Sequence, residues 1–191
     1  MSSTEEWNRF WEIDLFRGLA VVGMVIFHFT FDLNFLGFVT LNLGPGLWFL
    51  LAFPIAFTFI LLVGISMVIS YDRRKDMMSK AEMHRKYLLR GLKILAYGMV
   101  ITVFTRIFVP SAFVIFGILH FIGVSVILSY LLLLYNIDRR IYLVLAVFVS
   151  FIGSVLNSVS FETPWFLWLG LRPENFHTLD YFPLLPWFSV V

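Results

Sequence analysis

Long apolar runs separated by short polar segments dominate the chain. Residues 33–71, 107–137 and 141–161 contain no Asp, Glu, Lys or Arg. A helix needs about 20 apolar residues to cross the hydrocarbon of a bilayer, whereas a barrel strand shows alternating polarity over about ten. The pattern therefore predicts transmembrane helices. We place them at 13–33, 47–70, 91–109, 113–135 and 141–158, with a sixth that starts near Tyr181.

Helix-breaking residues support these limits. Gly44, Pro45 and Gly46 precede the second span, and Pro110 separates the third from the fourth. Only eleven residues follow Asp180, too few to cross a bilayer, so the sixth helix is expected to be incomplete. We therefore expect residues 1–191 to form a single all-α transmembrane domain, a polytopic helical bundle that lacks its C-terminal helices.

Composition excludes several classes of protein. Hydrophobic residues make up 60% of the chain, and charged residues make up 14%. A soluble domain carries roughly a quarter charged residues, so neither a soluble nor a disordered protein fits. The absence of Cys excludes disulfides, thiolate nucleophiles and Cys-ligated metals. A formal net charge of only +2 gives no reason to expect a nucleic-acid partner.

The positions of the basic residues predict the orientation. If the N-terminus is cytoplasmic, twelve of the 14 Lys and Arg fall on the cytoplasmic side: Arg9, Arg17, eight within 73–93, and Arg139 with Arg140. Only Arg106 and Arg172 fall on the other side. This asymmetry follows the positive-inside rule and predicts a multi-pass protein of the plasma or inner membrane with its N-terminus in the cytoplasm.

The first span carries a stripe of ionisable residues. At 100° per residue, Arg17 and His28 lie about three turns apart on one face, and Asp14 and Asp32 lie five turns apart on that same face. Arg17 would stand at the cytoplasmic end, with His28 roughly 16 Å away near the outer end. Ionisable groups at membrane depth are costly and usually face a bundle interior or a watery cavity.

The stripe admits more than one interpretation. Asp14 and Arg17 could simply anchor the cytoplasmic end of the helix. Asp32, one turn after His28, could hold the imidazole in one tautomer and raise its basicity, as a general base requires. The same two residues could instead form a buried hydrogen-bonded pair. As metal ligands they lack an identifiable third partner, so no metal is expected.

The same residues carry a family resemblance. RGLAVVGMVIFH (17–28) resembles the first helix of acyltransferase family three, with an Arg and a His separated by ten residues. The longer string EIDLFRGLAVVGMVIFHFTFDL (12–33) is more similar to a prokaryotic family related to the catalytic domain of heparan-α-glucosaminide N-acetyltransferase. Further matches are FILLVGISMVIS (59–70), RKYLLRGLKILAYGMVI (85–101), FGILHFIGVSVILSY (116–130) and DYFPLLPWFSVV (180–191). These strings cover most of the chain in order.

The resemblance implies a membrane acetyltransferase. Such a bundle would take acetyl-CoA as co-substrate from the cytoplasm and pass the acetyl group to a hydroxyl or amine acceptor at the outer face. His28 matches the acyltransferase His, as general base or transient acetyl carrier, and Arg17 matches the basic residue of the motif. CoA phosphates would bind among Arg17, Arg90 and Lys93, and the acceptor would be a glycan or amino sugar.

Three further residues are candidates for an acceptor site near the outer end. Arg106 is the only charge in the third span after Lys93 at its start, and it could snorkel to the interface or contact the acceptor. His120 lies on the fourth span at a depth similar to that of His28, although a lone His on an apolar helix is commonly a hydrogen-bonded core residue. Asp180 is the first residue of the DYFPLLPWF string, whereas we interpret the nearby His177 as a solvated loop residue.

Two other classes of function stay open. The stripe could form a proton or ion path in a transporter, although paired broken helices and an internal repeat are missing from the sequence. The chain could also be a non-catalytic subunit of a membrane complex. The segment 72–93 could be an amphipathic surface helix that leads into the third span, or simply a solvated basic loop. Its basic cluster is explained by topology alone, and it would also suit CoA phosphates. Besides the bilayer, acetyl-CoA and a small-molecule or glycan acceptor, a second copy of the chain is a conceivable partner.

Overall fold

Helices are the main secondary structure of the described residues. The computed structural model describes residues 10–40, 45–135, 137–161 and 164–191. Within these ranges the only pairing of extended backbone is a single parallel bridge between Ser160 and Arg172. Gly44 and Arg9, which supported a span boundary and the charge count, lie outside the described residues. The prediction of an all-α membrane protein is confirmed.

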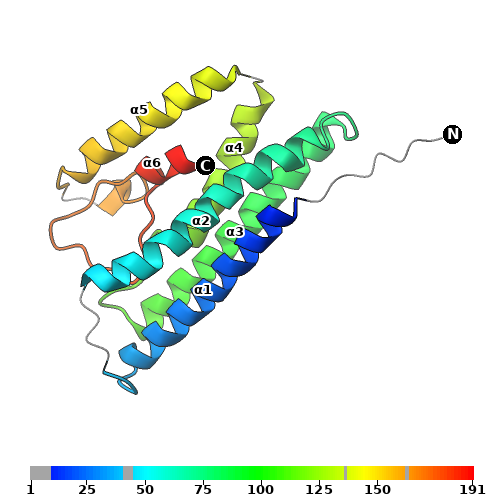
Figure 1. Ribbon diagram of the computed structural model, residues 1–191. Coiled ribbons are helices and arrows are strands. Elements are labelled where there is room, and N and C mark those ends of the chain that lie inside the picture. Colours follow the sequence, from blue (N-terminus) through cyan, green and yellow to red (C-terminus); the bar gives the residue numbers. More distant parts are fainter. Residues whose placement is uncertain (1–9, 41–44, 136, 162–163) are drawn as a thin grey trace. The chain divides into compact units, whose positions relative to one another are not determined.

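Five long helices and one short one follow in order. They are α1 (Trp11–Phe35), α2 (Pro45–Asp72), α3 (Lys80–Phe108), α4 (Ile118–Leu134), α5 (Arg139–Asn157) and α6 (Leu184–Trp187), labelled in Figure 1. Two 3₁₀ turns, η1 (Pro164–Phe166) and η2 (Phe188–Val190), lie before and after α6. Among the described residues, four helices are long and apolar enough to cross a membrane, namely α1, α2, α3 and α5, and α4 is a shorter apolar helix.

The helix limits differ from the predicted spans at three places. The third helix begins at Lys80, well before residue 91, because Ser79 and Glu82 form a capping box that starts the helix among charged residues. Residues 80–93 are therefore helical and continuous with the span. The fourth helix begins at Ile118, later than residue 113, because the preceding loop is held by side chains from elsewhere. Near Tyr181 the chain stays irregular until Leu184.

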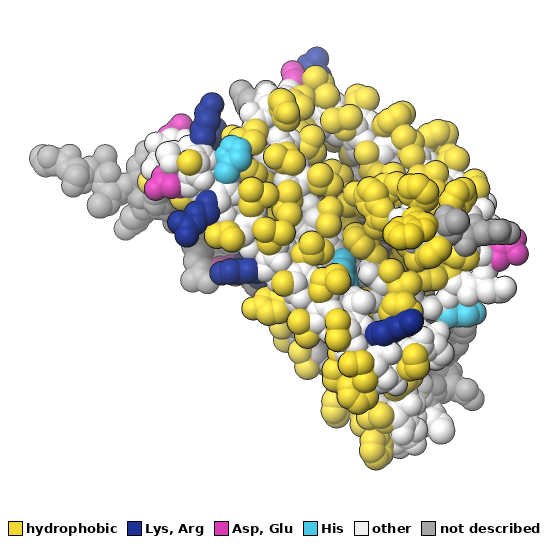
Figure 2. Space-filling view, turned by 180° about the vertical axis from the view of Figure 1, so that it is seen from behind, with side chains coloured by type: hydrophobic (Ala, Val, Ile, Leu, Met, Phe, Trp, Pro, Cys, Tyr) yellow, Lys and Arg dark blue, Asp and Glu magenta, His cyan; other side chains and the backbone are white. Residues whose placement is uncertain are grey.

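The described chain divides into two compact units, residues 1–62 and 63–191, with the division inside α2. In the first unit α1 packs closely beside α2 at one point: a Cβ placed on Gly23 would lie 3.1 Å from Cγ1 of Ile55. Most other α1 side chains are exposed. Figure 2 shows hydrophobic side chains over most of the face that it presents, as expected where lipid is the solvent.

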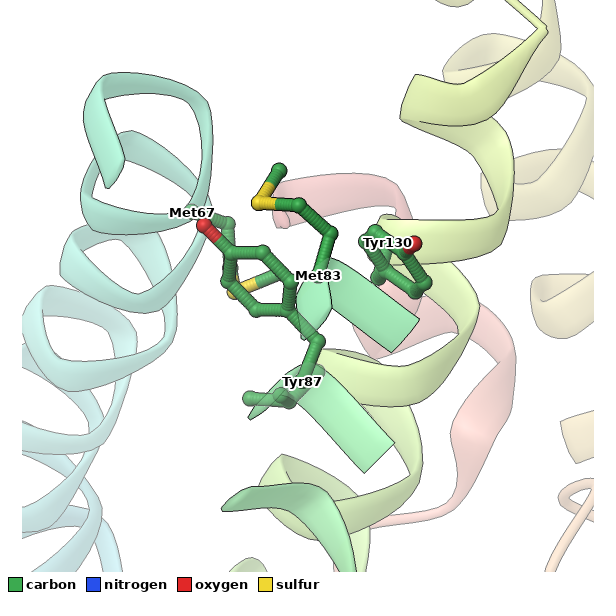
Figure 3. Close-up of a cluster of buried hydrophobic side chains, with 5 residues drawn as sticks. Met67, Met83, Tyr87 and Tyr130 are labelled. Atoms are coloured by element: carbon green, nitrogen blue, oxygen red, sulfur yellow. The ribbon is translucent and has the colours of Figure 1, made fainter. Parts of the chain in front are cut away.

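The core of the second unit is built by three helices. Met67 of α2, Met83 and Tyr87 of α3, and Val126 and Tyr130 of α4 form a cluster of buried side chains. In Figure 3 these side chains converge on the space between the three helices. The rings of Tyr87 and Tyr130 stack with their centroids 4.8 Å apart, and both side chains are fully buried. This cluster lies toward the end of α3 that carries the basic residues.

The segment after α5 returns to the other end of α3 and α4. The Leu184 amide donates to the Trp168 carbonyl at 2.7 Å, and the Phe182 amide donates to the Phe116 carbonyl at 3.1 Å. The segment that includes α6 then packs on α5, where a Cβ on Gly153 would lie 2.5 Å from the Pro186 nitrogen. The chain between 178 and 186 is thus fastened to the α3–α4 loop, to η1 and to α5.

Candidate active site

All four residues of the predicted stripe lie on α1, which is helical over its whole length. Asp14 and Arg17 form a salt bridge of 2.9 Å. His28 and Asp32 are both exposed, and the structure of the described residues shows no hydrogen bond between them. The His28 ring instead meets the ring of Phe27 edge-on, with the centroids 5.5 Å apart. The orientation of His28 by Asp32 stays a prediction.

Within the described ranges, no three His, Cys, Asp or Glu side chains stand close enough to share a metal ion. The other predicted site residues, Arg90, Lys93, Arg106, His120 and Asp180, belong to the second unit. There they divide between two ends of α3. Arg90 and Lys93 are exposed residues of its basic half, and Arg106 is in its last turn.

Arg106 packs on an aromatic ring of the α3–α4 loop. Its guanidinium carbon lies 4.5 Å from the ring centroid of Phe113, within the range of a cation–π contact. The side chain remains exposed. A guanidinium held on one face by an aromatic ring keeps its donors free for a polar group brought to its edge.

His120 is buried and is bonded through both ring nitrogens. Only 2% of its surface is exposed. Its Nδ1 accepts from the Gly117 amide at 3.3 Å, and its Nε2 lies 3.2 Å from the Thr102 hydroxyl. Because Nδ1 accepts, a neutral ring carries its proton on Nε2 and donates it to Thr102. His120 therefore joins the start of α4 to α3.

Asp180 binds the start of α4 from a distant part of the chain. Its Oδ2 accepts from the Ile118 amide at 2.8 Å, one of the amides that have no partner inside the helix. A carboxylate at this position also suits the helix dipole. The carboxylate approaches Gly117 so closely that a Cβ there would collide with it. His120 and Asp180 thus accept from the adjacent amides of Gly117 and Ile118.

Neighbouring polar contacts hold the loop that carries Asp180. The Thr178 hydroxyl donates to the Phe113 carbonyl at 2.9 Å, and the Leu179 amide donates to the Ala112 carbonyl at the same distance. The Tyr181 hydroxyl donates to the Leu167 carbonyl at 2.8 Å, and burial raises the pKa of Tyr181 to about 12. The α3–α4 loop, the start of α4 and the 178–182 segment therefore form one connected polar region.

Sequence reasoning missed the partners that hold these candidates. Thr102 contacts His120, and the Thr105 hydroxyl accepts from the Val114 amide at 3.0 Å. At the basic half of α3 it missed Tyr87 and Tyr130, which are fully buried. A signal was available, because polar groups on otherwise apolar helices tend to mark helix–helix contacts.

The fold and these contacts define a class of protein. It is an all-α, multi-pass membrane protein whose α1 carries a His and an Arg on one face and whose loops gather further polar groups at one end of α3 and α4. The family model described as heparan-alpha-glucosaminide N-acetyltransferase, catalytic, matches residues 9–191, nearly the whole chain. The chain belongs to this family, which is a family of membrane acetyltransferases. No curated protein and no solved structure matches the chain.

Proposed function

We propose that this protein transfers the acetyl group of acetyl-CoA to a hydroxyl or amine acceptor, a glycan or amino sugar, at the outer face of the cell membrane. The family match over residues 9–191 is the observation that carries this proposal. Two features support it. The only His of α1 lies on a face with Arg17, and the chain's basic residues gather in 73–93, where a phosphorylated donor would be attracted.

The donor would be bound through its charged end. In the first unit, Arg17 is an exposed cation that suits a phosphate of CoA, and Asp14 fixes its guanidinium through a salt bridge. In the second unit, Arg90 and Lys93 are exposed cations of the same kind. In this proposal the basic half of α3 faces the cytoplasm, as the positive-inside rule requires. The thioester would extend along the face of α1 toward His28.

His28 would act as general base on the acceptor. The imidazole takes the proton of the acceptor hydroxyl or amine while the acceptor oxygen or nitrogen bonds to the thioester carbonyl carbon. The carbon–sulfur bond then breaks, CoA leaves as the thiolate, and the imidazolium returns the proton to the sulfur. Asp32, one turn further on, would stabilise the imidazolium in the meantime.

Arg106, His120 and Asp180 would serve the acceptor in different ways. Arg106 is exposed and could bind polar groups of the acceptor directly. His120 and Asp180 act through α4, since both bond to residues at its start. We propose that these two residues position the acceptor site and that Arg106 contacts the acceptor.

The first test compares variants of the purified protein. His28→Ala should lower acetyl transfer by roughly a hundredfold or more, because the base is lost, and it should leave acetyl-CoA binding intact. Arg17→Ala should weaken binding of acetyl-CoA, measured as a smaller rise in thermal stability. For the wild type that rise is about 2.7 kcal/mol at a ligand concentration near a hundred times the dissociation constant.

Matched controls are available in the chain. His177 lies on an exposed loop and Arg140 is an exposed residue in the first turn of α5, so His177→Ala and Arg140→Ala should behave like the wild type. Undiminished transfer by His28→Ala would refute its role as base. If the folded protein neither binds acetyl-CoA nor transfers an acetyl group, the result would favour the transporter or subunit hypothesis.

A further inference from the structure

The ammonium nitrogen of Lys86 is shielded from solvent, although the residue as a whole is only half-buried. This Nζ forms no hydrogen bond within the described part of the chain. It lies 5.4 Å from the ring centroid of Tyr87, which is itself fully buried. A buried charge without a partner is expensive, so natural proteins rarely keep one unless something else satisfies it.

A second cation, Arg74, is connected to the same tyrosine through Ser70. The Tyr87 hydroxyl lies 2.9 Å from the Ser70 hydroxyl, and the Arg74 guanidinium donates to that Ser70 oxygen at 2.8 Å. Ring and hydroxyl of Tyr87 thus connect Lys86 of α3 with Arg74, just beyond the end of α2. Both helices pack around Tyr87 in the core shown in Figure 3.

The charges around Lys86 are of the same sign. Arg74 and Arg90 both repel its ammonium group electrostatically. Two acidic side chains of the adjoining segment are engaged elsewhere, since Asp72 pairs with Lys75 at 3.1 Å and Glu82 belongs to the capping box with Ser79. A water molecule could accept a hydrogen bond from Lys86, but it would not offset three positive charges. An anion would accept the hydrogen bond from Lys86 and would also offset the positive charges.

We infer that Lys86, Arg74 and Arg90, with the Ser70 hydroxyl, form a binding site for a phosphate group. Phosphate has the charge and the several acceptor oxygens that an ammonium group and two guanidinium groups require. It could come from the headgroup of an acidic phospholipid or from a soluble phosphate ester. If the ester is CoA, the inference rests on the proposed function. If it is a lipid, the site stands without that function.

The test measures thermal stability of the full chain in an uncharged detergent. Three probes are added separately: pyrophosphate, CoA, and phosphatidic acid, the last compared with phosphatidylcholine. At least one anionic probe should raise the unfolding temperature of the wild type. Lys86→Gln should weaken binding of that probe by about tenfold or more, because a charged hydrogen bond is lost.

The control is Lys75→Gln. It removes the same charge in the same segment, but its ammonium already pairs with Asp72, a hydrogen bond that raises the pKa of Lys75. It should respond like the wild type. Arg74→Gln, at an exposed position, gives a second test in case Lys86→Gln does not fold, and it too should weaken binding.

The pattern of responses identifies the source of the phosphate. A response to phosphatidic acid alone indicates a lipid headgroup, and a response to pyrophosphate or CoA indicates a soluble ester. The inference is overturned if no anionic probe stabilises the wild type, or if the Lys86 and Arg74 variants respond as strongly as Lys75→Gln. Loss of acetyl transfer in His28→Ala is a separate result, so failure of the proposed function would be seen independently.

Discussion

At the scale of single residues, polar groups near the start of α4 each bind a backbone group of another segment. Asp180 accepts from the Ile118 amide, Thr178 donates to the Phe113 carbonyl, and Tyr181 donates to the Leu167 carbonyl. A buried backbone group without a hydrogen-bond partner costs free energy, and backbone groups in loops lack the partners that a helix provides. These side chains therefore stabilise the loops by bonding to their backbone groups. The contribution of Tyr181 depends on pH in the alkaline range.

Raising the pH should destabilise this region through Tyr181. Burial raises the pKa of Tyr181 from its usual value of 10.0 to about 12, so the folded protein favours the neutral phenol. Its contribution to stability is complete below pH 10 and is lost as the pH rises from about 10 to about 12. The measurement is the unfolding temperature across this range, which should fall more steeply in the wild type than in Tyr181→Phe.

The Tyr181→Phe variant also reports the hydrogen bond itself. At neutral pH it should lose about 1 kcal/mol of stability, because the Leu167 carbonyl loses its donor. Equal slopes for the two proteins above pH 10 would contradict the assignment of the alkaline transition to Tyr181.

At the scale of elements, glycines bring α3 and α4 together. A Cβ on Gly91 of α3 would lie 2.7 Å from the Gly123 carbonyl oxygen, and one on Gly123 of α4 would lie 2.8 Å from the Leu95 amide nitrogen. Further along α3, a Cβ on Gly98 would lie 3.0 Å from the His120 ring. Small residues let helices approach closely in lipid, where packing rather than the hydrophobic effect drives association. The candidate residue His120 therefore lies in the same close contact between α3 and α4.

Replacing Gly123 by Val should push α4 away from α3. We expect a loss of about 1–3 kcal/mol, the usual cost of overpacking, because the neighbouring atoms belong to the backbone and cannot rotate aside. Thermal unfolding in detergent measures this effect. Gly18→Val is the matched control, since no atom lies within 4 Å of a Cβ placed there. Similar losses in both variants would indicate a general effect of Val in these helices.

At the scale of the whole molecule, charge is concentrated in a few segments and apolar surface covers the rest. Residues 73–93 hold eight of the 14 basic residues, and large apolar side chains are exposed along α1, α3 and α5. This distribution is that of a multi-pass protein surrounded by lipid, and the positive-inside rule predicts that the basic segment lies on the cytoplasmic side. The direction of acetyl transfer in the proposed function depends on this orientation.

Single cysteines can test the orientation, because the chain has none of its own. Lys75→Cys, between α2 and α3, should react with an impermeant thiol reagent only after the membrane is opened. Arg172→Cys, in the loop before α6, should react in intact cells. The measurement is labelling of each variant with and without permeabilisation. The reverse pattern would invert the orientation, and the donor site with it.

Much of the fold follows from local physics. Apolar length and helix breakers predict the helices, because a chain in hydrocarbon must satisfy its backbone within each segment. The Asp14, Arg17, His28 and Asp32 stripe follows from helical periodicity alone, and α1 is helical as required. The capping box of Ser79 and Glu82 starts α3 at Lys80, whereas hydropathy by itself predicts only the span from residue 91.

What the tertiary structure decided is which distant polar groups meet. Asp180 and Ile118 are 62 residues apart, and Thr102 and His120 are 18 apart. Such contacts depend on how helices and loops pack, and no local pattern encodes that. The same holds for Lys86, which the sequence shows only as one of many basic residues in its segment. Its burial beside Tyr87, and with it the need for an anion, arises only when α2, α3 and α4 come together.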